Sequence, residues 1–199
     1  MRIASLSPAI TEILFALQLQ DKLVCTDQFS DYPDDAQCIP HVPDSIYDDI
    51  RELYDYDVNI VFTSKVSENL KRGEFSVSVH NPQSINEVYE MIRSIGMMMQ
   101  CEDKSEALVL RMQQGFKDIK RKSSLLQKRL CVYIEHGDNP WIKEVAHIAG
   151  LEQVTGEDTA DIVVAKGARN IDMSLLKRPG PRLVDGSRYL YGWAFEKLH

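Results

Sequence analysis

Residues 2–17 read Arg-Ile-Ala-Ser-Leu-Ser-Pro-Ala-Ile-Thr-Glu-Ile-Leu-Phe-Ala-Leu, and they carry the strongest structural signal of the chain. The apolar run 3–6 predicts a buried strand. Ser7 then stands at the N-cap position of a helix, where its side chain can accept a bond from a free N–H, and Pro8 stands at the first helical position. Apolar residues follow at helical spacing: Ile10, Ile13, Leu14 and Leu17. The helix 8–18 therefore starts at the carboxyl edge of a sheet, where open α/β folds bind ligands.

The rest of the chain alternates apolar runs with amphipathic stretches. Strands are predicted over 22–26, 57–63, 75–79, 130–134 and 160–165, and helices over 45–54, 66–71, 82–96, 139–150, 171–176 and 182–198. Gly96 and Gly150 are expected to end the helices that precede them. This alternation predicts an α/β protein with parallel sheets covered by helices on both faces.

One stretch, residues 102–128, differs in kind because it contains no proline and one glycine, Gly115. A helix over this range would be about 40 Å long, which is too long for an ordinary crossover helix. No heptad pattern persists in it, so it is not a coiled coil. Gly115 is interpreted as a kink or a point of close packing.

Composition and charge exclude several classes of partner. The net charge of −7 argues against nucleic acid or an anionic membrane, because both require a basic face. No apolar segment is long enough to be inserted in a membrane. The four cysteines (Cys25, Cys38, Cys101, Cys131) have no metal-ligand spacing and are interpreted as free thiols in a reducing compartment. A cytoplasmic location is expected, or a periplasmic or lipid-anchored one if an upstream signal was removed.

No sequence motif for catalysis is present. There is no G-x-S-x-G, P-loop or G-x-G-x-x-G pattern, and the histidines show no zinc spacing. Glu135, His136 and Asp138 form the one compact acid–base cluster, at the end of a strand. We predict no catalytic residue, no metal ligand and no catalytic cofactor, and a small enzyme built on this cluster is the last of the alternatives.

Two separated motifs resemble those of a known family. Residues 2–17, followed by Phe-Ser-Asp-Tyr-Pro at 29–33, are similar to the opening of the vitamin B12 and metal-chelate substrate-binding proteins, and Arg-Pro-Gly-Pro-Arg-Leu-Val-Asp-Gly at 178–186 is similar to the motif near their end. The resemblance implies two Rossmann-like lobes joined by one long helix. It assigns 1–101 to the first lobe, 102–128 to the connecting helix and 129–199 to a shortened second lobe.

The resemblance also implies a ligand and a set of contacts. The ligand is a cobalamin-like corrinoid or another metal chelate, held between the lobes by aromatic stacking and hydrogen bonds without a protein–metal bond. Phe29 matches a ligand-stacking aromatic, Trp141 matches aromatics of the second lobe, and Arg178 matches an arginine of the cleft. Ser64 stands where a B12 binder has tryptophan, and Tyr47 is expected to substitute for an aromatic missing nearby. Trp141 is equally compatible with core packing.

The alternatives differ in partner. One is a substrate-binding component for haem, ferric chelates or B12 that delivers to an ABC permease. At the position where the family carries a docking carboxylate, however, Arg51 stands beside Glu52. The other is a ligand-free interaction module, for example a homo-oligomer, which the shortened second lobe favours.

Overall fold

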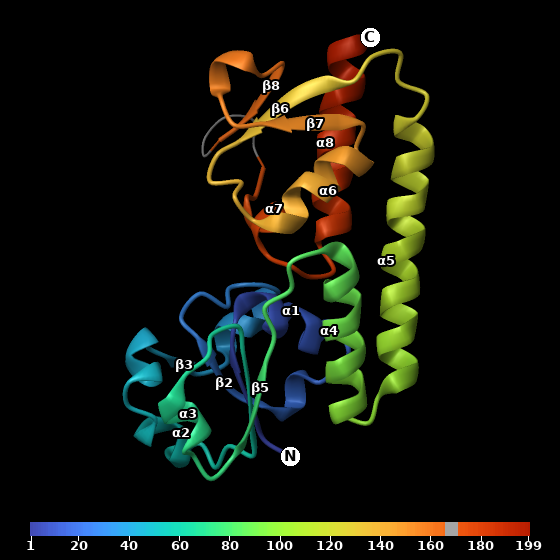
Figure 1. Cartoon of the computed structure of the whole chain (residues 1–199). Helices are drawn as coiled ribbons and strands as arrows, with labels where there is room; N and C mark the ends of the chain where they lie inside the picture. The colour runs from blue at the N-terminus through green and yellow to red at the C-terminus, as the bar shows by residue number, and fades with distance from the viewer. Residues whose placement is uncertain (166–170) are drawn as a thin grey trace. The chain divides into compact units, whose positions relative to one another are not determined.

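The computed structural model describes residues 1–165 and 171–199 (Figure 1). These residues form two compact units, Met1–Asn81 and Pro82–His199, and each is described by itself.

The first unit is built on a five-stranded parallel sheet of order β3-β2-β1-β4-β5. Its elements are β1 (Ile3–Leu6), α1 (Pro8–Ala16), the 3₁₀ helix η1 (Gln20–Lys22), β2 (Leu23–Asp27), η2 (Asp34–Cys38), β3 (His41–Val42), η3 (Asp44–Tyr47), α2 (Arg51–Asp55), β4 (Ile60–Thr63), α3 (Glu68–Lys71) and β5 (Ser76–Val79). Alternate residues of the central strand β1 face opposite sides of the sheet. Ser5 contacts α1 on one side, while Ala4 and Leu6 pack with Ile46, Leu53 and Leu70 of η3, α2 and α3 on the other.

The predicted start of α1 is confirmed, with Ser7 at the N-cap in extended conformation and Pro8 in the first turn. The predicted capping bond from the Ser7 side chain is wrong, since that side chain makes no cap hydrogen bond. The carbonyl of Ser7 instead accepts both the backbone N–H (2.9 Å) and the hydroxyl (3.2 Å) of Thr11.

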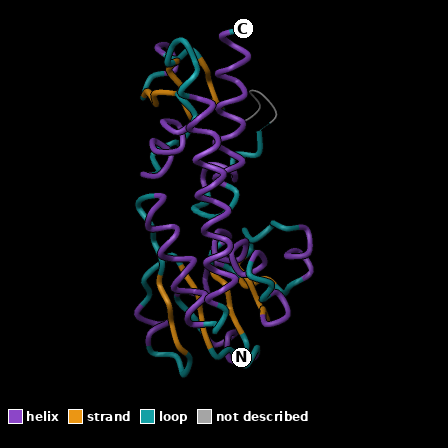
Figure 2. The backbone as a smooth tube through the Cα atoms, turned by 90° about the vertical axis from the view of Figure 1, so that its right-hand side faces the viewer, coloured by secondary structure: helices purple, strands orange, loops and turns teal. Residues whose placement is uncertain are grey.

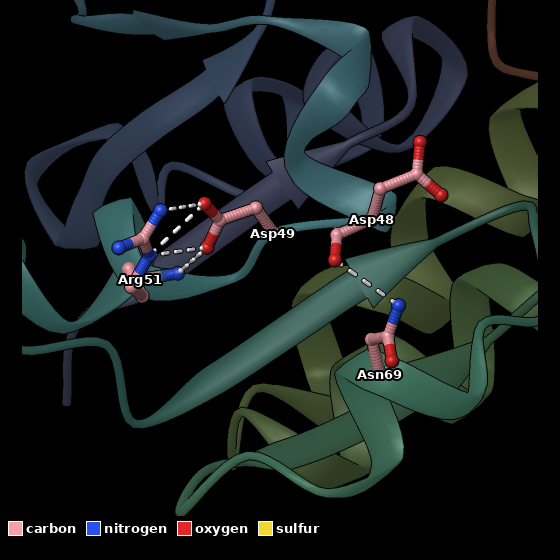
Figure 3. A network of polar contacts seen from close by, with 4 residues as sticks. All are labelled: Asp48, Asp49, Arg51 and Asn69. Carbon is pink, nitrogen blue, oxygen red and sulfur yellow. Dashed lines mark hydrogen bonds and ion pairs between the residues drawn. The ribbon is translucent and has the colours of Figure 1, made fainter.

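The predicted helix over 45–54 is two short helices, η3 and α2, with a break between them. Asp49 Oδ1 accepts the backbone N–H of Arg51 at 3.2 Å and its guanidinium Nε at 2.8 Å (Figure 3). The backbone carbonyl of Asp48 accepts the side-chain amide of Asn69 at 3.2 Å. Such side-chain bonds to the backbone compete with helical bonds, so the chain restarts its helix at Arg51.

The second unit holds a three-stranded parallel sheet of order β7-β6-β8 among its described residues. Its elements are α4 (Ile85–Met98), α5 (Glu102–Ser123), β6 (Leu130–Ile134), α6 (Pro140–Ile148), β7 (Leu151–Val154), η4 (Glu157–Thr159), β8 (Ile162–Val164), α7 (Ser174–Lys177) and α8 (Leu183–Leu198). Figures 1 and 2 show α4 and α5 running side by side, where Arg93 Nε binds Glu106 Oε2 at 2.7 Å. The predicted α/β class with parallel sheets is confirmed, and the described sheet of the second unit has three strands against five in the first unit.

Two glycines of this unit differ in how well they were predicted. Gly96 does not end its helix, which continues to Met98; a Cβ on it would lie 2.1 Å from Ser105 Oγ, so it serves close packing of α4 on α5. Gly115 is confirmed as a close-packing point, because a Cβ there would lie 2.5 Å from Val184 Cγ1 of α8.

The long helix α5 has 22 residues, so it spans about 33 Å and ends five residues earlier than predicted. The Ser123 hydroxyl donates to the carbonyls of Lys120 and Ile148, the latter at 2.7 Å, and this fixes the end of α5 against α6. Both α4 and α5 belong to the second unit, and the three-part division at residues 101 and 128 stays a prediction.

Candidate functional site

The candidate site of the first unit lies at the carboxyl edge of its sheet. Because all five strands are parallel, the segments that follow them meet at one edge. Phe29 follows β2, Tyr47 ends η3 just beyond β3, and Ser64 follows β4. The fold thus brings three of the five predicted ligand residues to the same edge.

Phe29 is the most exposed aromatic of this edge, with 53% of its surface accessible. It lies in a turn in which the Ser30 N–H donates to the Asp27 carbonyl at 3.2 Å. About half of this large apolar ring is therefore accessible to solvent, which is unusual for a phenylalanine.

A buried network of hydrogen bonds connects this turn to α1 and β1. The Thr11 hydroxyl of α1 lies 2.8 Å from both Ser5 Oγ and Ser30 Oγ, and Ser30 Oγ donates to Asp27 Oδ1 at 2.6 Å. Ser5, Thr11 and Ser30 are at most 1% exposed. These residues connect β1, α1 and the end of β2 through hydroxyl groups that water does not reach.

Tyr47 makes hydrogen bonds at the same edge of the sheet. Its hydroxyl lies 3.0 Å from both the Leu6 carbonyl, to which it donates, and Thr63 Oγ1. The Lys65 ammonium lies 4.7 Å from the centre of its ring, and burial raises the pKa of the phenol above its ordinary value. Ser64 is half-buried between Thr63 and Lys65. Tyr47 therefore joins the ends of β1 and β4, with Lys65 over its ring.

The end of β5 carries a half-buried imidazole. His80 Nε2 lies 2.8 Å from Ser78 Oγ, and its ring stacks on that of Phe62 with centroids 6.2 Å apart. Burial lowers the pKa of His80 below its ordinary value. The neutral imidazole is thus favoured at this strand end.

The second unit has a cavity of about 440 Å³ at the ends of β6 and β7. His136, Gly137, Asp138, Lys143, Gln153 and Thr155 are among its lining residues. His136 adopts a positive φ of 53°, and the Gly137 carbonyl accepts the side-chain amide of Gln153 at 2.8 Å. No hydrogen bond joins His136 to Asp138 in the described residues, so the geometry does not favour an acid–base pair.

Trp141 and Arg178, the other two predicted ligand residues, lie in the second unit. Trp141 is 5% exposed, and its indole N–H donates to the Leu176 carbonyl at 2.8 Å. Arg178 is half-buried just after α7, and its backbone N–H donates to the Ser174 carbonyl. The described structure gives Trp141 a packing role, and ligand contact by either residue stays a prediction.

A further cavity of about 630 Å³ lies among α5, α6 and β7 and is lined by both charged and apolar side chains, including Lys120, Arg129, Glu144, Ile148 and Leu151. Over residues 1–165 and 171–199 there is no cluster of three or more side chains suited to a metal ion. In the same residues no helix has the length and apolarity needed to cross a membrane. All four cysteines are free thiols in the structure.

Sequence reasoning missed the polar network under Phe29 and the ammonium over Tyr47. Thr11 was visible as a polar residue inside an apolar helix stripe, which is a signal for a buried hydroxyl with a partner. Nothing in the sequence pairs Thr11 with Ser30, because the contact depends on how α1 packs beside the end of β2.

Comparison with known proteins places the chain in a family. The profile of the periplasmic binding proteins matches residues 43–184. An ABC transporter substrate-binding lipoprotein of uncharacterized function, YvrC of Bacillus subtilis strain 168, is 26% identical over 242 aligned positions, which cover 93% of this chain and 77% of the relative. The vitamin B12-binding protein of Yersinia pestis is 49% identical over 41 residues, or 21% of this chain and 15% of that protein.

Solved structures share the fold. The periplasmic haem-binding protein BhuT, in complex with two haems, has a TM-score of 0.82 at 15% identity and covers 100% of this chain and 99% of its own. The periplasmic vitamin B12-binding protein BtuF of Vibrio cholerae has a TM-score of 0.79 at 17% identity, covering 98% and 97% of the two chains. The family profile and these folds lead to one conclusion: the chain belongs to the periplasmic binding protein family, whose members bind solutes.

Proposed function

We propose that this protein binds a metal chelate with a large planar ring, of the cobalamin or haem kind, and that Phe29 stacks on that ring. The observation that carries the proposal is the exposed Phe29 ring on a hydrogen-bonded turn at the carboxyl edge of a parallel sheet. A planar macrocycle is largely apolar, and an aromatic face gains both burial and a stacking geometry from it. The names of the relatives, which bind vitamin B12 or haem, support this class of ligand.

The remaining predicted contacts have different roles in the proposal. Tyr47 and Ser64 line the edge beside Phe29 in the first unit. The Lys65 ammonium lies over the Tyr47 ring and 3.5 Å from Asp44 Oδ1, and it is proposed to exchange this ion pair for an anionic substituent of the ligand. Arg178 and the edge of Trp141 are proposed as contacts from the second unit. The ligand is proposed to be held by stacking and hydrogen bonds, without a protein–metal bond.

We further propose delivery to an ABC permease outside the cytoplasm. The Bacillus subtilis relative is named an ABC transporter lipoprotein and the solved neighbours are named periplasmic, so the comparisons give no support to the cytoplasmic location expected from the sequence. In the region where the resemblance implies a docking carboxylate, Arg51 stands beside Glu52, and the Arg51 guanidinium is held by Asp49. The neighbouring Asp48 and Glu52 are the carboxylates that remain for a permease.

The test is a titration of the purified protein with cyanocobalamin, haemin and a ferric siderophore, followed by visible absorption after gel filtration and by calorimetry. Phe29→Ala is expected to weaken binding about 10- to 100-fold, the range that corresponds to losing the burial of one phenylalanine. Phe195→Ala is the matched control, because Phe195 is a similarly exposed phenylalanine, 45% accessible, on α8.

Two outcomes would count against the proposal. If Phe29→Ala and Phe195→Ala bind the chelate as tightly as the unmodified protein, Phe29 is not a contact. If none of the three chelates binds, the ligand-binding function itself fails, and the interaction module becomes the working hypothesis.

A further inference from the structure

The turn that presents Phe29 is closed by two hydrogen bonds between the same two residues. The Ser30 backbone N–H donates to the Asp27 carbonyl at 3.2 Å, and the Ser30 hydroxyl donates to Asp27 Oδ1 at 2.6 Å. Phe29 is the third residue of this four-residue turn. A bond to a carboxylate is shorter and stronger than a neutral one, so the turn is internally well defined.

The two hydrogen bonds within the turn do not by themselves fix its orientation relative to α1. The turn continues from β2 at Asp27, and its side-chain link to α1 is the contact between Ser30 Oγ and the Thr11 hydroxyl, at 2.8 Å. Because the Ser30 proton goes to Asp27, Ser30 Oγ is the acceptor in this contact. Thr11 is itself held, since its hydroxyl oxygen also lies 2.8 Å from Ser5 Oγ and 3.2 Å from the Ser7 carbonyl oxygen. These groups are buried, so water does not compete for their hydrogen bonds.

We propose that Thr11 is a positioning residue for Phe29. It touches no ligand; it holds the 27–30 turn against α1 and β1 through Ser30, so that the Phe29 ring has one orientation before a ligand arrives. The consequence for affinity rests on the proposed function, because a ring that is already ordered loses less conformational entropy on binding.

The experiment measures amide hydrogen exchange over residues 28–32 in the unliganded protein. Thr11→Val keeps the shape but removes the hydroxyl, Thr11→Ser keeps the hydroxyl, and Ser30→Ala breaks the same link from the turn. Thr26→Val is the matched control, because Thr26 is equally buried in the same sheet but its hydroxyl contacts His41 Nδ1 at 2.8 Å.

Loss of the Thr11–Ser30 hydrogen bond is expected to speed exchange in this turn about three- to tenfold in Thr11→Val, and at least as much in Ser30→Ala, which also removes the bond to Asp27 Oδ1. Thr11→Ser should restore the slow exchange, and Thr26→Val should leave the turn unchanged. Unchanged exchange over 28–32 in Thr11→Val would overturn the proposal. So would an equal rise in Thr26→Val, because the effect would then be general loosening of the unit.

A second arm uses haemin as the probe, with affinity measured from visible absorption. The affinity of Thr11→Val is expected to fall about fivefold and to be regained in Thr11→Ser. Unchanged affinity together with faster exchange would overturn the link from turn order to binding. If the unmodified protein binds no haemin, the proposed function fails for this ligand, and the exchange results alone decide whether Thr11 positions the turn.

Discussion

Two glycines of helix α8 provide a matched test of the packing in the second unit. A Cβ added at Gly186 would lie 2.6 Å from the carbonyl oxygen of Leu175 and 2.8 Å from Leu176 Cδ2, whereas a Cβ at Gly192 would meet nothing within 4 Å. Both substitutions to alanine gain about 1 kcal/mol of helix propensity, so this gain cancels when the two variants are compared. The difference in their free energies of unfolding therefore measures the clash.

The size of the clash follows from what would have to move. The nearest atom is a backbone oxygen of α7, and α7 is held in place by the bond from the Trp141 indole to the Leu176 carbonyl at 2.8 Å. Overpacking of a well-filled site costs about 1–3 kcal/mol, and a fixed backbone atom favours the upper part of that range. We expect Gly192→Ala to be stabilised by about 0.5–1 kcal/mol and Gly186→Ala to be destabilised by about 1–2 kcal/mol.

The assay is urea unfolding followed by tryptophan fluorescence and by circular dichroism. Both tryptophans, Trp141 and Trp193, lie in the second unit, so the fluorescence change reports on that unit alone. Unfolding free energies of the two variants that agree within about 0.5 kcal/mol, the usual scatter of surface substitutions, would refute the packing of α8 on α7 described above.

Three further predictions concern the first unit. Tyr47→Phe should lower the free energy of unfolding by about 1 kcal/mol, because it removes the hydrogen bond from the Tyr47 hydroxyl to the Leu6 carbonyl. Tyr54→Phe is the control, because the Tyr54 ring is exposed and its substitution should change the free energy of unfolding little. Equal urea midpoints for the two variants would contradict the role of Tyr47 in joining β1 and β4. Burial lowers the pKa of His80 in the folded protein below 6.5, the ordinary value that holds in the unfolded chain. As the pH falls, the unfolded chain therefore takes up a proton before the folded protein does. The stability from neutral His80 is present above pH 6.5 and is lost as the pH falls through the lower pKa of the folded state. His80→Gln should therefore reduce the drop in melting temperature between pH 7.5 and pH 5.5, and an unaltered drop would count against this. Burial, with Glu52 nearby, raises the pKa of the Cys25 thiol to about 12, so at pH 8 a thiol reagent should modify exposed Cys38 quickly and Cys25 only after unfolding; rapid labelling of Cys25 itself in the folded protein, located by peptide mass spectrometry, would contradict this.

The sequence predicted those elements whose signals are local. The strand before Ser7, the helix that begins at Pro8 and the glycine that ends α6 follow from residues within one or two turns of each other, and Gly150 has the positive φ of 82° that such an ending requires. Prediction was wrong where a distant partner decides the outcome. Gly96 resembles a helix end but is placed inside α4 by contact with Ser105, and the residues of β7 were missed because they pair with β6.

The site shows the same division. Phe29 is predicted as a ligand contact from a motif of adjacent residues, and its place at the sheet edge follows from the parallel strands; the contact itself stays a prediction. Trp141 was equally compatible with ligand contact and core packing, and the bond from its indole to the Leu176 carbonyl, 35 residues away, gives it a packing role.

By itself, the sequence determined the α/β class, the parallel strands, the long helix of the second unit and the resemblance to substrate-binding proteins, because these depend on periodicity and on motifs of neighbouring residues. Only the tertiary structure decided which side chains meet. Thr11 reaches Ser30 across 19 residues, and Tyr47 reaches Leu6 across 41. Such contacts form when elements that are separate in the sequence pack together and bury their polar groups, and a buried hydroxyl takes whichever partner the packing brings within hydrogen-bond distance.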